Sequence, residues 1–302
     1  ERLTCVPGES YLAVLDALHD SGIDVMICRN EGGAAMMAEA YGKLTGRPGI
    51  CFVTRGPGAT NASHGAHIAA QDSTPMILFI GQVARDMRER EAFQEVDYRQ
   101  FFGGMAKWVV EVEDAARFPE LIARAFRVAM QGRPGPVVVA LPEDMLVDVV
   151  AVGDAPRVEP VAIWPAAAQL AELGGLLAEA RHPLAILGGS RWTEAARAQL
   201  VAWSERWALP VATSFRRTPL FPADHPNYAG DVGIGPNPKL AQRVREADLL
   251  LLIGGRLSEM ASSSYTLLDV PVPRQRLVHV HPGAEELGRV YAPTLAIQAS
   301  PD

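Results

Sequence analysis

The sequence predicts an α/β protein made of two three-layer α/β/α domains with mostly parallel sheets. Short β-branched runs alternate with segments that carry apolar residues at helical spacing, and this alternation is typical of βαβ units. The run Val137-Val138-Val139-Ala140-Leu141 is apolar throughout, as expected of a parallel strand covered on both faces. The length of 302 residues is sufficient for two domains, each with its own core.

The first half of the chain contains the clearest alternation. Its expected strands are residues 24–28, 49–54, 75–80, 107–110 and 136–141, and its expected helices are residues 9–20, 31–44, 57–70 and 115–130. Between residues 148 and 164 the pattern breaks, and prolines become frequent. We therefore expect a first domain over residues 1–147, a linker over residues 148–164 and a second domain over residues 165–302.

The second half repeats the same type of pattern. Its expected helices are residues 166–180, 194–207 and 238–246, and its expected strands are residues 184–187, 248–253 and 276–281. A long polar loop is expected after Thr213. The spacing of these segments predicts a second α/β domain of Rossmann-like organisation.

Composition excludes several classes of partner. Lysine and arginine number 28 against 35 acidic residues, a formal net charge of −7, which argues against a nucleic-acid or anionic-membrane surface. Apolar stretches such as residues 249–253 are far shorter than the roughly 20 residues of a membrane span. The spacing of Cys5, Cys28 and Cys51 matches no zinc pattern, so we interpret them as reduced core thiols in a cytoplasmic protein.

Several short motifs stand at the ends of expected strands, where parallel sheets bind ligands. They are Val6-Pro7-Gly8, Glu31 with the small residues after it, Thr54-Arg55-Gly56-Pro57-Gly58-Ala59-Thr60-Asn61, Gly81-Gln82-Val83 and Phe93-Gln94-Glu95. Taken singly, each has an ordinary structural explanation. The first is a turn, Glu31 could complement a helix dipole, and the glycine-rich turn lacks the lysine and the spacing of a phosphate loop.

Taken in order, these motifs resemble the pyrimidine-binding domain of thiamine-diphosphate enzymes, acetolactate (acetohydroxyacid) synthases in particular. Asp72-Ser73-Thr74-Pro75 and Gly132-Arg133-Pro134-Gly135-Pro136-Val137 extend the resemblance. The second half is similar to the central domain of that family, through Ala185-Ile186-Leu187-Gly188-Gly189, Leu209-Pro210-Val211 and His279-Val280-His281-Pro282.

The resemblance assigns Glu31 as the catalytic carboxyl, which hydrogen-bonds the pyrimidine N1′ of the cofactor and promotes its activated tautomer. It also implies that the cofactor-binding residues are Pro7, Glu31, Thr54, Pro57, Asn61 and Gln94. Gly56 and Gly58 would allow close backbone approach. For Pro7 and Pro57, a rigid turn is an equally good explanation.

This sequence departs from the family pattern close to the expected site. Asn30 stands where acetolactate synthases have His, Gly32 where they have Gln, and Arg55 where they have Ser, while Glu9-Ser10 replace Gly-Ala. The 2-keto acid substrate is therefore left open. His64 and His67 fall in an expected helix, and we interpret them as core or interface residues before catalytic ones.

The resemblance further implies thiamine diphosphate and Mg²⁺ as cofactors. The family holds Mg²⁺ through a G-D-G motif followed by N-N in a third domain, and this chain contains neither. We therefore expect the chain to be part of a longer enzyme, inactive by itself and carrying no metal site. Flavin adenine dinucleotide (FAD) is a further candidate, at the glycines 188–189, 230–235 and 254–255, although we favour structural turns there.

The leading functional hypothesis is a transferase of the acetolactate synthase type. Such an enzyme decarboxylates a 2-keto acid and transfers the resulting two-carbon unit to an acceptor. One alternative is a thiamine-diphosphate-dependent 2-keto acid or acyl-CoA decarboxylase or lyase, and another is a non-catalytic nucleotide-binding module. By the resemblance, a homodimer or homotetramer would form through the pyrimidine domain, with residues 84–102 and the helix after Glu31 at its interface.

Overall fold

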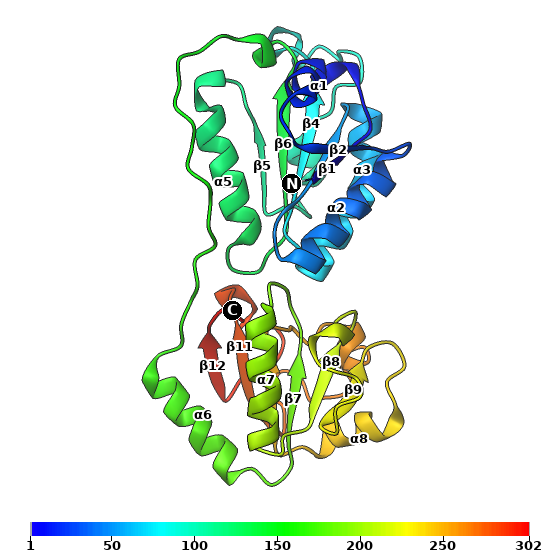
Figure 1. The fold of residues 1–302 in the computed structure, drawn as a ribbon. Helices are drawn as coiled ribbons and strands as arrows, with labels where there is room; N and C mark the ends of the chain where they lie inside the picture. The colour runs from blue at the N-terminus through cyan, green and yellow to red at the C-terminus, as the bar shows by residue number, and fades with distance from the viewer. Residues whose placement is uncertain (1, 302) are drawn as a thin grey trace. The chain divides into compact units, whose positions relative to one another are not determined.

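A computed structural model describes residues 2–301, and the chain divides into two compact units between Pro160 and Val161. Each unit contains one six-stranded sheet in which the neighbouring strands pair in parallel (Figure 1). Helices cover both faces of each sheet. The prediction of two α/β domains with mostly parallel sheets is therefore confirmed.

The first unit has the sheet order β2-β1-β3-β4-β6-β5. Its strands are β1 (Arg2–Cys5), β2 (Asp24–Ile27), β3 (Gly49–Val53), β4 (Met76–Gln82), β5 (Trp108–Glu111) and β6 (Pro136–Pro142). Its helices are α1 (Leu12–His19), α2 (Glu31–Thr45), α3 (Gly56–Asp72), α4 (Tyr98–Phe102) and α5 (Phe118–Met130). Strand order reverses between β1 and β3, which is where a doubly wound sheet opens a crevice for a ligand.

Strand β6 shows how the first core is built. Val137 and Val139 face α1 and α5, whereas Val138 and Ala140 face α2 and α3. Each of these four side chains is at most 1% exposed. The unbroken apolar run of this strand follows from that burial on both faces, as the sequence predicted.

Local signals set the ends of the helices beside the site. The side chain of Asn30 caps α2 by accepting a hydrogen bond from the backbone N–H of Gly33, and Gly46 ends the helix in the left-handed region at φ 69°. At the end of α3, Arg133 donates to Ser73 Oγ at 2.9 Å. The G-R-P-G-P motif thereby fixes the C-terminus of α3 against the start of β6.

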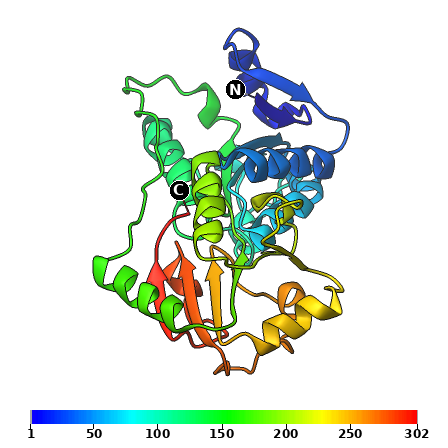
Figure 2. The same cartoon turned by 60° about the horizontal axis from the view of Figure 1, so that its bottom comes forward.

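The second unit has the sheet order β12-β11-β10-β7-β8-β9. Its strands are β7 (Pro183–Leu187), β8 (Val211–Ser214), β9 (Tyr228–Val232), β10 (Leu249–Ile253), β11 (Arg276–His281) and β12 (Leu295–Gln298). Its helices are α6 (Ala167–Glu179), α7 (Glu194–Arg206) and α8 (Pro238–Glu246). In Figure 2 the adjacent arrows of β10, β11 and β12, coloured gold to red, point the same way.

Several elements of the structure are not among the expected strands and helices, including β1 and β8. Strand β9 lies inside the predicted long polar loop, so that prediction was wrong for residues 228–232. Its sequence, Tyr-Ala-Gly-Asp-Val, has no clear apolar alternation, and a register shift interrupts its pairing with β8. The short elements α4 and β12 were also missed. Short edge strands and a five-residue helix carry little sequence signal, because their contacts are made by tertiary neighbours.

Residues 148–166 form no helix or strand. They include the predicted linker 148–164, which stays a prediction. Ile163 already belongs to the second unit, where its backbone exchanges hydrogen bonds with Ser300. Among residues 2–301, no helix combines the length and the apolar character needed to cross a membrane. Cys5 and Cys51 are buried free thiols, whereas Cys28 is partly exposed just beyond β2.

Candidate functional site

The candidate site lies at the carboxyl ends of β2, β1, β3 and β4 in the first unit. These strands are neighbours in the sheet, so the turns that follow them meet at one edge. Ser10 Oγ lies 2.9 Å from Thr54 Oγ1, which joins the turn after β1 to the turn after β3. A Cβ at Gly8 would lie 2.5 Å from the Cβ of Thr54. The V-P-G motif therefore needs its glycine so that the two turns can touch.

Glu31 is the first residue of α2, which follows β2. Its carboxylate is half-buried, and its Oε2 accepts a hydrogen bond of 3.1 Å from Asn61 Nδ2 on α3. A carboxylate in the first turn of a helix is favoured by the helix dipole, by about 0.3–1 kcal/mol at an exposed position. Two of the residues predicted for the site, 31 and 61, are thus brought together although 30 residues separate them in the chain.

Small residues bring α2 and α3 into backbone contact next to this pair. A Cβ at Gly65 would lie 2.5 Å from the carbonyl carbon of Ala35. A Cβ at Gly32 would lie 3.2 Å from His64 Nδ1. Gly32, which stands where the family pattern has Gln, therefore leaves room for the side chain of His64. His64 and His67 are both exposed, so the prediction that they belong to the core is wrong, whereas an interface role stays a prediction.

Gln94 approaches the site from the segment between β4 and α4. Its backbone is left-handed at φ 65°, and a Cβ at Gly56 would lie 2.7 Å from the Gln94 carbonyl oxygen. Gly56 itself has φ 25°, a region that favours glycine. The backbone N–H of Gly56 donates to Tyr98 Oη at 3.1 Å. Burial raises the pKa of the Tyr98 hydroxyl to about 12, so it remains protonated there.

Thr54, Pro7 and Pro57 complete the set of predicted residues. Thr54 is half-buried between the turns, as its bond to Ser10 requires. Pro7 and Pro57 are exposed, and Pro57 occupies the first turn of α3, where proline is well tolerated. The arrangement is consistent with both explanations offered for these prolines, namely rigid turns and contact with a ligand.

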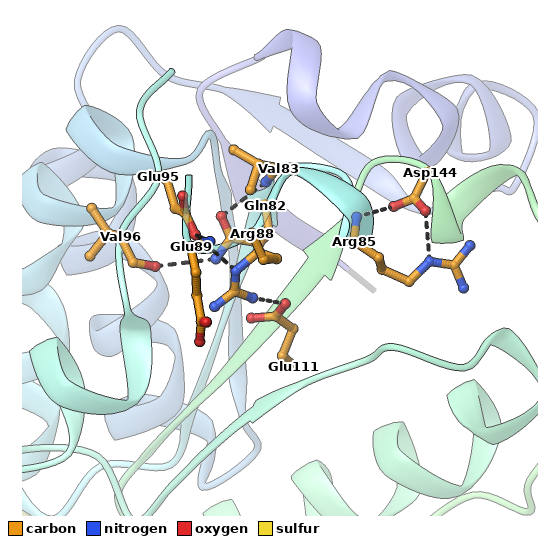
Figure 3. Close-up of polar contacts among 9 residues, drawn as sticks. All are labelled: Gln82, Val83, Arg85, Arg88, Glu89, Glu95, Val96, Glu111 and Asp144. Carbon is orange, nitrogen blue, oxygen red and sulfur yellow. Dashed lines mark hydrogen bonds and ion pairs between the residues drawn. The ribbon is translucent and has the colours of Figure 1, made fainter. Parts of the chain in front are cut away.

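Sequence reasoning missed the partners of Arg55. Its buried guanidinium donates to Glu143 Oε2 at 3.1 Å and to Glu9 Oε1 at 3.4 Å. Glu143 directly follows β6, so the contact depends on strand order and has no signal in the local sequence. Gln82 was noted only as part of a motif. The structure shows it fully buried, with its Nε2 donating to the carbonyl of Val96 at 3.2 Å (Figure 3).

A charged network adjoins the Gln94 segment. Arg88 pairs with Glu95 and with Glu111 of β5, and Arg85 pairs with Asp144 (Figure 3). Arg85, Arg88 and Glu111 also line a cavity of about 450 Å³. The other residues that line it are Glu89, Asp97, Tyr98, Arg99, Val109, Val110, Glu113 and Ala140. The network thus connects strand β5 to the loop that carries Gln94.

Four of the glycines considered for flavin contacts, those of the turns after β7 and β10, are explained by packing. A Cβ at Gly188 would lie 2.7 Å from the Cα of Gly255, and one at Gly189 would lie 2.1 Å from the carbonyl oxygen of Gly254. The turns after β7 and β10 therefore press directly on each other. Arg256 and His279 line an adjoining cavity of about 60 Å³, whereas ligand sites measure about 300–1,000 Å³. This cavity is too small for a flavin.

Each of the two units contains a match to a known protein family. Residues 1–101 match the family model described as the N-terminal TPP binding domain of thiamine pyrophosphate enzymes. Residues 170–302 match the model of the central domain of the same enzymes. The chain belongs to the thiamine pyrophosphate enzyme family. Thiamine pyrophosphate is another name for thiamine diphosphate, so the resemblance noted in the sequence is confirmed.

The curated proteins to which this chain is similar include several acetolactate synthases. The large subunit of isozyme 2 from Escherichia coli is 32% identical over 296 residues, which are 97% of this chain and 53% of the relative. The probable large subunit from Methanocaldococcus jannaschii is 31% identical, with 94% of this chain and 49% of the relative covered. The large subunit from Corynebacterium glutamicum is 32% identical, with 94% and 46% covered. The chain spans about half the length of the curated relatives it matches.

Proposed function

We propose that this chain forms the pyrimidine-binding and central parts of an acetolactate synthase-like enzyme. The whole protein would decarboxylate a 2-keto acid and transfer the remaining two-carbon unit to an acceptor. The names of the relatives support this reaction class. The observation that carries the proposal is the contact between Glu31 and Asn61 at the start of α2, in the crevice of the sheet.

The residues present fit the pyrimidine end of thiamine diphosphate. When bound, this cofactor supplies a thiazolium carbon acid that stabilises the charge left by decarboxylation of a 2-keto acid. Glu31 would hydrogen-bond the pyrimidine N1′ and hold a proton there, while Asn61 fixes the orientation of the carboxylate. The turns that carry Pro7, Thr54, Pro57 and Gln94 would enclose the ring, because their close packing has already set the shape of this edge.

Replacement of Glu31 by glutamine tests the proposal in the whole enzyme. Glu31→Gln keeps the size of the side chain but removes the acid, so we expect turnover to fall on the order of 10²- to 10⁴-fold. The measurement is the initial rate of 2-keto acid decarboxylation and of product formation with thiamine diphosphate and Mg²⁺. Glu172→Gln, at an exposed position of α6, serves as the control and should keep full activity. Full activity of Glu31→Gln would contradict the proposal.

Other cofactors and subunits belong to the whole protein. In this proposal, Mg²⁺ and the diphosphate are bound by residues outside this chain, and the central part carries no flavin. The close packing of the glycine turns after β7 and β10 supports this part of the proposal. A homodimer or homotetramer would use the exposed apolar side chains of α2, of the segment before α4 and of α4 itself. These include Met36, Met37, Leu44, Phe93 and Phe101.

A decarboxylase or lyase is the second candidate. It is favoured by the residues that adjoin Glu31, since Asn30 is committed to capping α2 and Gly32 presents no side chain. The acetolactate synthase pattern places His and Gln at these positions, so the acceptor side of the site would differ. The product of the rate measurement distinguishes the two reactions, because only a carboligase forms a carbon–carbon bond.

A further inference from the structure

The segment that delivers Gln94 to the site has an unusual backbone. Between β4 and α4, the non-glycine residues Glu89, Glu91 and Gln94 have φ values of 61°, 54° and 65°. Left-handed conformations of such residues cost on the order of 1–3 kcal/mol each and persist only where their surroundings enforce them. The contacts that enforce them therefore determine where residue 94 lies.

Glu95 makes most of these contacts. Its Oε1 accepts from the backbone N–H of Glu89 at 2.8 Å and from Arg88 Nε at 3.1 Å (Figure 3). Its Oε2 accepts from the backbone N–H of Ala92 at 3.2 Å. Hydrogen bonds to its carboxylate hold the pKa of Glu95 below its usual range. The largest effect comes from the backbone N–H of Glu89, followed by the backbone N–H of Ala92 and the side chain of Arg88. Glu95 is thus an anion that closes the loop from inside, with its side chain 13% exposed.

The network is anchored at both ends. Arg88 also pairs with Glu111, which ties the loop to β5. On the other side, Gln82 at the end of β4 holds the carbonyl of Val96. With the chain fixed before and after it, residue 94 is pressed against Gly56, the first residue of α3.

We propose that Glu95 is a positioning residue for the cofactor site, acting through Gln94. It holds the turn 89–95 in the left-handed conformation that places Gln94 against the glycine turn of α3. Arg88 extends this hold to strand β5. The inference rests on the proposed function, in which Gln94 lines the pyrimidine end of the cofactor.

The test uses Glu95→Gln in the whole enzyme. The amide keeps the shape of the side chain but presents an NH₂ group to a ring of N–H donors, so the loop must relax. We expect kcat/KM and the affinity for thiamine diphosphate to fall on the order of 10- to 100-fold. Trypsin should also cut faster after Arg90, which is exposed in this loop. This last measurement needs no bound cofactor.

A second variant shows whether the effect passes through Gln94. Gln94→Ala alone should lower kcat/KM by a similar factor. Adding Glu95→Gln to it should then cost less than about twofold more, because the residue that Glu95 positions has lost its side chain. The control is Glu120→Gln, which breaks the exposed pair with Arg117 and should change none of these quantities.

Three outcomes would overturn the inference. The first is an unchanged kcat/KM in Glu95→Gln, and the second is an unchanged kcat/KM in Gln94→Ala. The third is a double variant in which the losses of the two single variants add up. If Glu95→Gln does not fold, Arg88→Lys replaces it, because lysine keeps the charge and loses the planar fork that reaches both Glu95 and Glu111. Failure of the proposed function is recognised separately, by retention of activity in Glu31→Gln.

Discussion

Arg55 stands in the glycine turn where the acetolactate synthase pattern has serine, and its charge is buried. The structure pairs it with Glu9, a second departure from the pattern, and with Glu143. The two unusual residues lie in the turns after different strands, Glu9 after β1 and Arg55 after β3, yet they meet because β1 and β3 are adjacent. Arg55 brings a buried charge into the glycine turn, and Glu9, the other departure from the pattern, supplies a partner for it.

Arg55→Ser should therefore destabilise the protein. It leaves the half-buried carboxylate of Glu143 without its guanidinium, and we expect the free energy of unfolding to fall by about 1–3 kcal/mol in urea titrations. Adding Glu143→Gln should restore part of this loss. Arg117→Ser breaks an exposed pair and should cost about 0–1 kcal/mol. An effect of Arg55→Ser no larger than that of Arg117→Ser would show that the buried pair contributes nothing.

Among elements, the packing of α2 against α3 decides the geometry of the site. Gly65 lies one helical turn after Asn61, and Ala35 lies one turn after Glu31, so the close Gly65–Ala35 contact stands directly next to the Glu31–Asn61 hydrogen bond. The small residues of both helices are required because their backbones nearly touch. The spacing between the helices thus sets the length of the Glu31–Asn61 hydrogen bond.

Gly65→Ala should push the two helices apart. The added methyl group would lie 2.5 Å from the backbone of Ala35, and such overpacking costs about 1–3 kcal/mol. We expect a lower thermal midpoint together with a lower rate in the whole enzyme. Gly175→Ala in α6 is the matched control, since a Cβ there meets nothing within 4 Å and should stabilise its helix by about 0.5–1 kcal/mol. Equal behaviour of the two variants would contradict this account of the interface.

For the whole molecule, the second unit carries a buried titratable group that makes its stability depend on pH. His281 is 2% exposed at the end of β11, and its Nδ1 accepts from the backbone N–H of Gly283 at 3.0 Å. Burial lowers the pKa of His281 to about 4. The folded chain therefore holds this ring neutral at pH values where an unfolded chain would already bind a proton.

Stability should fall as the pH drops from about 6.5 to about 4. In this range the unfolded state binds the proton of His281 and the folded state does not, which amounts to about 3 kcal/mol at 1.36 kcal/mol per pKa unit. His281→Gln should flatten this part of the profile of thermal midpoint against pH. His19→Gln, at an exposed position of α1, should leave the profile unchanged. An unchanged slope in His281→Gln would exclude His281 as the cause.

Much of the fold and the family could be predicted because their signals are local. Continuous apolar runs marked β4, β6 and β10, and helix α8 and strand β11 have the predicted bounds. The motif order also predicted Glu31 and its neighbourhood. Strand β9 escaped prediction because its five residues gain their pairing from β8 and carry no periodic pattern of their own.

The sequence by itself determined the fold class and the family, and it predicted Glu31, Asn61 and Gln94 as members of one site. These depend on short segments whose chemistry and order are readable along the chain. Only the tertiary structure decided what holds those residues in place, such as Tyr98 on Gly56, Glu95 within its loop and Glu143 on Arg55. The physical reason is that parallel strands gather the ends of distant segments at one edge, so the supporting contacts join residues whose separation along the chain carries no signal.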